Sequence, residues 1–88
     1  MLYTLSQANY DANTLTDILA QVTKNDAVLL WQDGVLQAVK NPEKFANLPN
    51  VFVLEPDCAA RRIQTHLTAL SLADTVRLTE RFSPQIAL

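Results

Sequence analysis

Short apolar runs recur along the chain, separated by segments with the periodicity of helices. Residues 27–31 and 51–54 are continuously apolar, and residues 2–5 form a shorter β-prone run. An antiparallel strand with one wet face would alternate apolar and polar residues, whereas a continuous run bounded by turns fits a strand covered on both faces. These runs predict three buried strands. We expect a fourth strand near residues 67–70, where the pattern is ambiguous.

A helix is predicted after the first strand. From Thr14 onward, apolar residues occupy positions i, i+3, i+4 and i+7 of one helix face. These residues are Leu15, Ile18, Leu19 and Val22. We expect Asn13 or Thr14 to cap the start of this helix and Lys24 to lie near its end. The apolar stripe is expected to face the core.

Helix signals also fall on residues 35–40, 55–63 and 72–82, and residues 41–50 are expected to form a connection. The second of these helices should begin with Pro56 at its first helical position and Asp57 in its first turn, where a negative charge suits the helix dipole. Ser71 is the expected N-cap of the last helix, with Asp74 three residues further on.

Four strands thus alternate with helical segments. This order is typical of α/β proteins, in which crossover connections place helices over a parallel sheet. We therefore predict an α/β fold with a parallel sheet and helices on both faces, formed by residues 1–88 as a single domain. A domain of this size buries a modest core, so a partner would add to its stability.

Composition excludes several classes of function. Seven Lys and Arg against nine Asp and Glu give a net charge of −2, which argues against direct binding of nucleic acid. A single glycine excludes the P-loop and the dinucleotide fingerprint. A single cysteine excludes a disulfide within the chain and a CxxC pair. One cysteine and one histidine without metal-ligand spacing argue against a structural zinc site, so we expect no cofactor and no metal. The first residues resemble no signal peptide and no run could span a bilayer, which favours a cytoplasmic protein.

Cys58 is the candidate residue for chemistry. It should lie in the first turn of a helix that follows a strand, at the sheet edge where α/β proteins place their ligands. Helix N-termini lower the pKa of thiols, and Arg61 and Arg62 would help, whereas Asp57 would oppose. A thiolate at this position could attack sulfur or carry a persulfide. The alternative is a small buried hydrophobic residue, which most free cysteines are.

The other candidates have simpler interpretations. Asp33 and Gly34 follow a buried strand, and we expect Gly34 to supply a positive φ and Asp33 to cap the next helix. His66 could pair with Cys58 if the fold brought them together, but a surface position is the simpler expectation. The aromatic residues Trp31, Phe52 and Phe82 are expected in the core or at an interface.

Several stretches resemble one family. The opening "MLYTLSQ", the strand and turn "LLWQDGVLQAV", the strand and helix "VFVLEPDCAARRI" and the ending "VRLTERFSPQIAL" are similar to the TusB/DsrH family. The stretches occur in the same order as in that family and span nearly the whole chain. The "QDGV" after an apolar run and the closing "VRLT" helix with its short tail are the most specific.

The resemblance implies a small flavodoxin-like (DsrEFH-like) subunit of a sulfur-relay complex. Such a complex is a hetero-hexamer that also contains a TusC-like and a TusD-like subunit. It receives persulfide sulfur from a carrier protein and passes it on for 2-thiolation of the wobble uridine of certain tRNAs. The main sulfur-carrying cysteine belongs to a sibling subunit, so this subunit would be mainly structural, without catalytic residues of its own.

Two departures from the family pattern bear on this expectation. Some DsrH-type relatives, which serve sulfur oxidation, carry a cysteine near the position of Ile18, and its absence favours the TusB branch. Other TusB-like chains have an aliphatic residue at Cys58, so no family role transfers to that residue. The alternatives are a sulfurtransferase or carrier that uses a Cys58 persulfide, a DsrH-type sulfur-oxidation subunit, and a stand-alone regulatory domain.

Overall fold

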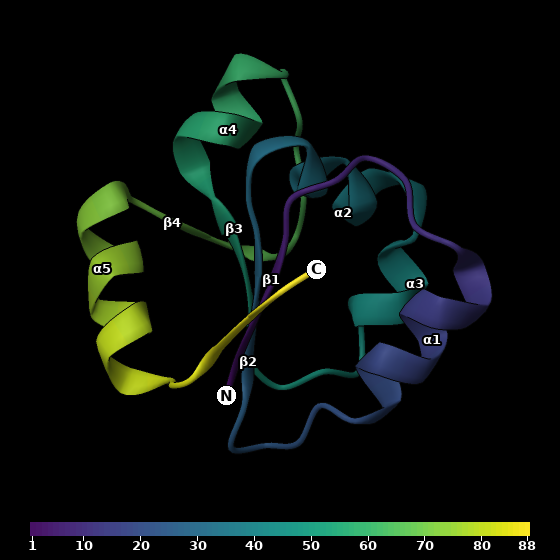
Figure 1. The fold of residues 1–88 in the computed structure, drawn as a ribbon. Coiled ribbons are helices and arrows are strands. Elements are labelled where there is room, and N and C mark those ends of the chain that lie inside the picture. Colours follow the sequence, from purple (N-terminus) through teal and green to yellow (C-terminus); the bar gives the residue numbers. More distant parts are fainter.

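Five parallel strands form one sheet in the computed structural model, which describes residues 1–88 (Figure 1). The strand order is β4-β3-β2-β1-β5. The strands are β1 (Leu2–Leu5), β2 (Ala27–Leu30), β3 (Val51–Leu54), β4 (Thr68–Leu70) and β5 (Gln85–Ala87). The helices are α1 (Ala12–Ala20), the 3₁₀-helix η1 (Gln32–Leu36), α2 (Gln37–Lys40), α3 (Pro42–Phe45), α4 (Glu55–Ala60) and α5 (Leu72–Arg81). None of these helices is both long and apolar enough to cross a membrane.

The direction in which the chain crosses the sheet explains the two helical layers. From β1 to β4 each strand is added on the same side of the one before, and right-handed crossovers keep the intervening helices on one face. The connection from β4 to β5 returns across the whole sheet, so α5 covers the opposite face. Figure 1 shows α1, α2 and α3 on one side of the sheet and α5 alone on the other.

The predicted fold class is confirmed. The sheet is parallel throughout, and helices cover both of its faces. The strand order, which the sequence did not specify, differs from the order 2-1-3-4-5 of flavodoxin itself. Here β1 and β2 lie inside the sheet, which is why their residues are all buried and their sequences do not alternate.

Alternating side chains of the strands divide the core into two clusters. The larger cluster has 12 buried residues and lies between the sheet and helices α1 to α3. It contains Leu15 and Leu19 of α1, and Ile18 and Val22 pack against it, as the apolar stripe predicted. The smaller cluster, under α5, consists of Leu2, Ala27, Leu29 and Leu78. The aromatic residues Trp31, Phe52 and Phe82 pack against this smaller cluster, in agreement with prediction.

The ends of α1 differ from prediction. Asp11, rather than Asn13 or Thr14, caps the helix, and its carboxylate accepts hydrogen bonds from the backbone N–H and the hydroxyl of Thr14 at 3.0 Å each. These bonds, the backbone bond first, hold the pKa of Asp11 below its usual value. The helix ends at Ala20, before Lys24. Asp11 competes successfully because a carboxylate is as good a cap as Asn and better than Thr.

Two elements were not predicted. Residues 41–50, expected to be a connection throughout, contain the single turn α3, which buries Phe45 in the larger cluster. The tail forms β5, which pairs with β1 at the edge of the sheet. Only its middle residue, Ile86, packs against the core, so the strand has no apolar run that could reveal it.

The last helix begins as predicted, with the Ser71 hydroxyl accepting from the Asp74 N–H at 3.1 Å.

Candidate functional site

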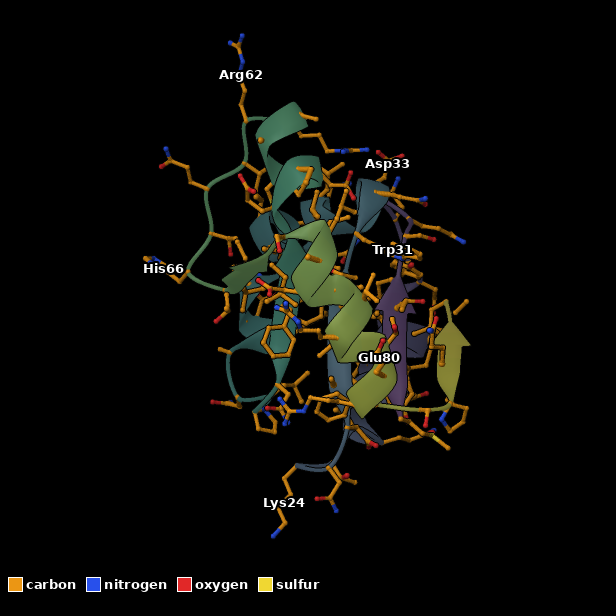
Figure 2. The ribbon with its side chains drawn as sticks, turned by 90° about the vertical axis from the view of Figure 1, so that its left-hand side faces the viewer. Lys24, Trp31, Asp33, Arg62, His66 and Glu80 are labelled. Carbon is orange, nitrogen blue, oxygen red and sulfur yellow. The ribbon has the colours of Figure 1, made fainter.

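Two short helices stand at the carboxyl ends of neighbouring strands. The η1 helix follows β2 and α4 follows β3, so both lie at the carboxyl end of the parallel strands, where α/β proteins bind ligands. In Figure 2, Asp33 and Arg62 mark this end of the molecule, opposite Lys24. The structure therefore brings the regions of Asp33 and Cys58 together, although they lie far apart in the sequence.

The role predicted for Gly34 is wrong. Its φ is not positive, and the left-handed residue of this loop is Gln32, at φ 52°. Glycine is needed for a different reason, because a Cβ on Gly34 would lie 1.8 Å from the backbone oxygen of Leu5. The η1 turn thus packs directly against the end of β1, with no room for any side chain at this position.

Asp33 likewise does not cap a helix. Asp33 is a residue of η1, and its carboxylate accepts hydrogen bonds from Nε and Nη2 of Arg61, at 3.1 and 2.8 Å. The Asp57 carboxylate accepts the backbone N–H of Gln32. Arg61 also donates to the backbone oxygen of Asp57, at 3.1 Å. These contacts tie α4 to η1, so the charged residues around Cys58 have a structural role in joining two strand ends.

Cys58 is 6% exposed and belongs to the larger core cluster. Burial raises the pKa of its thiol, and the charges of Asp57 and Glu55 raise it further, whereas Arg61 lowers it. The predicted lowering of this pKa is therefore wrong. A helix of six residues contributes little dipole, and desolvation of the thiolate outweighs the nearby arginine. The burial agrees with the simpler interpretation of Cys58 as a small hydrophobic residue.

A hollow of about 310 Å³ lies beside Cys58. We call it the Cys58 depression. Its lining is mainly apolar and comes from β3, α4, β4 and the segment between α4 and β4; it includes Val53, Cys58, Ile63, Leu67 and Ala69. The depression thus lies between the six-residue helix α4 and the outer strand β4.

His66 does not join Cys58. It is exposed and points away from the body of the molecule (Figure 2). It lines a neighbouring hollow of about 250 Å³ with Pro42 and Ala46; this hollow shares Leu67 with the Cys58 depression, whose lining does not include His66. No group of three or more His, Cys, Asp or Glu side chains lies close enough to hold a metal ion. The structure thus places His66 on the surface, as the simpler expectation had it.

The end of α4 contains an arginine in an unfavourable conformation. The Ile63 N–H donates to the Cys58 oxygen at 2.9 Å and the Arg62 N–H to the Ala59 oxygen at 3.2 Å, which is the Schellman pattern. Arg62 is the left-handed residue of this motif, at φ 54°, a position that usually holds glycine. Its side chain is exposed and points into solvent (Figure 2).

We expect Arg62→Gly to stabilise the protein by about 0.5–1 kcal/mol, because glycine adopts a positive φ without the steric cost of a Cβ. Chemical unfolding of the full chain measures this change, and thermal unfolding should show a midpoint several degrees higher. Arg62→Ala is the matched control, since it removes the same side chain and keeps the Cβ. Equal stability of the two variants would contradict this account.

Comparison with known proteins places the chain in a family. The family model described as DsrH like protein matches residues 7–85. An uncharacterized protein of Haemophilus influenzae is 39% identical over an alignment of 95 positions, which covers all of both chains. Protein TusB of Yersinia pestis is also 39% identical over an alignment of 95 positions, which covers 99% of each chain.

A solved structure supports the fold. Protein Tm0979 of Thermotoga maritima, determined by solution NMR, superposes with a TM-score of 0.65 over 91% of this chain and 92% of its own. At 20% sequence identity, this match shows that the two proteins share a fold and nothing more. Together with the matches over nearly the whole chain at 39% identity, these comparisons confirm the predicted resemblance: the chain belongs to the TusB/DsrH family.

Proposed function

We propose that this protein is the TusB-like subunit of a sulfur-relay complex. The observation that carries the proposal is the match to Protein TusB along 99% of both chains. The complex would contain a TusC-like and a TusD-like subunit in a cytoplasmic hetero-hexamer. It would pass persulfide sulfur toward 2-thiolation of the tRNA wobble uridine.

The role that we propose for this subunit is structural. A sulfur carrier needs a thiolate that a donor persulfide can reach. Cys58 is buried in the core, and burial raises the pKa of its thiol. Both properties oppose attack on sulfur, which supports a subunit that completes the assembly while a sibling supplies the reacting cysteine.

Replacement of Cys58 by serine tests this role. We expect Cys58→Ser to leave the 2-thiouridine content of tRNA at the wild-type level, because no step of the relay would use the thiol. The measurement is mass spectrometry of tRNA nucleosides from a strain whose own copy of the gene is replaced by the variant. The buried hydroxyl is expected to cost about 1 kcal/mol of stability, so Cys58→Ala serves as a second variant without that cost.

Native mass spectrometry of the tagged chain, purified from its host without reductant, provides the control. We expect both variants and the wild type to arrive with the same two small partner chains. Loss of 2-thiouridine from an intact complex in both variants would overturn the structural role. Purification of the wild-type chain alone would overturn the assembly itself.

The second candidate function is sulfur transfer by Cys58 itself. The observation in its favour is that Cys58 lines an open depression, with the Arg61 charge near enough to lower its pKa in part. A persulfide formed there would add one sulfur atom to the mass of the chain purified without reductant, and reduction would remove it. That mass shift, together with lost thiolation in Cys58→Ser and Cys58→Ala, would favour this function.

A further inference from the structure

The strand β4 is an exposed edge of the sheet. It pairs with β3 on one side only, and Thr68 and Ala69 are exposed. An edge strand presents unpaired backbone N–H and C=O groups, which can bind an additional strand. Proteins that recognise extended peptides in this way take affinity from the backbone and specificity from side-chain pockets that flank the edge.

Hollows lie on both faces of β4. On the face toward α4, the Cys58 depression is lined by Leu67 and Ala69 of the β4 region together with Val53 of β3. On the face toward α5, a groove of about 270 Å³ is lined by Leu70 of β4 and Phe52 of β3. We call the second hollow the Arg81 groove. In Figure 1, β4 lies between α4 and α5, the helices that bound these two hollows.

The two hollows differ in charge. Most residues of the Cys58 depression are apolar, and its one charged residue is the acidic Glu55. The Arg81 groove has three charged residues, Asp74, Arg77 and Arg81. Asp74 pairs with Arg77 at 3.0 Å, which leaves the Arg81 charge without a carboxylate. The Arg81 guanidinium lies 5.5 Å from the centroid of the Phe82 ring, in a cation–π contact.

Successive side chains of a strand point to opposite faces of the sheet. A strand added beside β4 would therefore direct one side chain toward the Cys58 depression and the next toward the Arg81 groove. We propose that β4 binds an extended segment of a protein partner as a sixth strand. The segment has apolar residues facing the Cys58 depression and acidic residues facing Arg81. This inference goes beyond the proposed function, because it needs no sulfur chemistry.

A second copy of this chain fits the edge poorly. The segment 64–70, which includes β4, has no acidic residue, and neither does the other edge strand, Gln85–Ala87. Neither edge strand of a second copy therefore has an acidic side chain to place in the Arg81 groove. The charge of the groove thus favours a different protein as the partner.

The experiment uses the full chain, isotopically labelled for NMR, and short capped peptides. The first peptide alternates valine and glutamate, the second alternates valine and lysine, and the third has the composition of the first with its valines and glutamates in separate blocks. We expect saturable amide shift changes at Thr68, Ala69 and Leu70 with the first peptide. The valine–lysine peptide should bind at least about fivefold more weakly because its charge repels Arg81. The blocked peptide should bind at least about fivefold more weakly because it cannot direct valine to one hollow and glutamate to the other along the same strand.

Variants on each face of the edge separate the two hollows. Ala69→Lys places a charged side chain on the apolar face of the edge strand, which opposes the addition of another strand, and Arg81→Glu reverses the charge of Arg81 in the groove. Each should weaken binding of the first peptide at least about fivefold. Arg81→Glu should also bind the valine–lysine peptide more tightly than the wild type does. The controls, Val39→Lys and Arg62→Glu, change exposed residues away from β4 and should bind the first peptide as the wild type does.

Several results would overturn the proposal. They are shift changes confined to residues outside β4, equal binding of the alternating and blocked peptides, and unchanged binding by both Ala69→Lys and Arg81→Glu. Shift changes at β4 that grow with protein concentration in the absence of peptide would assign the edge to a second copy of the chain.

Discussion

Gly34→Ala is expected to lower the free energy of unfolding by about 3 kcal/mol or more, a large part of the stability of a domain of this size. The added Cβ would lie 1.8 Å from the oxygen and 2.5 Å from the carbonyl carbon of Leu5. Both are backbone atoms of a buried strand, so no side-chain rotation can relieve the overlap. The Leu5 oxygen also accepts the Trp31 N–H at 3.1 Å, and that bond would be disturbed as the loop moved.

Urea unfolding of the full chain measures this loss, and a variant without any cooperative transition is the extreme form of the same result. Asp33→Ala is the matched control in the same turn. It removes the exposed pair with Arg61, which should cost less than about 1 kcal/mol. A Gly34→Ala variant that unfolds at the same urea concentration as Asp33→Ala would contradict the packing argument.

Gly34 also illustrates what the sequence can predict. The end of an apolar run at Asp33 and Gly34 correctly indicates a turn. The reason for the glycine is a contact with β1, nearly thirty residues earlier, and no local pattern encodes that contact. The φ expected of glycine belongs instead to Gln32, whose N–H is held by the Asp57 carboxylate. Local signals thus locate the turn, and tertiary contacts determine its conformation.

The strands and helices show the same difference between what local signals predict and what tertiary contacts determine. Continuous apolar runs identified the inner strands because burial on both faces removes the alternation of apolar and polar residues. The edge strand β5 and the single turn α3 have too few buried residues for such a signature. The charged cluster that joins α4 to η1 was not predicted either, although the spacing of Asp57 and Arg61 permits an i, i+4 pair. Their link to Asp33 depends on β2 and β3 being neighbours, which only the strand order reveals.

The pKa of Cys58 shows how burial can reverse a prediction from sequence. Its position at the start of a helix and the following arginines predicted a lowered pKa, and both features are present in the structure. The alternative interpretation, a small buried hydrophobic residue, is the one that the structure bears out: the thiol lies in the larger core cluster, where desolvation opposes its ionisation.

Gln37 is a buried polar residue that the sequence did not single out, and its replacement gives the other large expected effect. Its side chain is 1% exposed. Its Nε2 donates to the Ala8 oxygen at 2.6 Å, and its Oε1 accepts from Nδ2 of Asn41 at 2.9 Å. Gln37 therefore joins the loop after β1 to α2. We expect Gln37→Leu, which keeps the approximate volume, to cost about 2 kcal/mol because both partners lose a partly buried hydrogen bond.

Lys40 makes this prediction more specific, because its Nζ also donates to the Ala8 oxygen, at 3.2 Å. Lys40→Ala alone should cost less than about 1 kcal/mol, since its ammonium is at the surface. The double variant should lose more than the sum of the single losses, because the Ala8 oxygen then has no side-chain donor. Urea unfolding of the four proteins measures the coupling. Strictly additive losses, or a Gln37→Leu variant as stable as the wild type, would show that the Ala8 oxygen finds another donor and that Gln37 is not the residue that holds the loop.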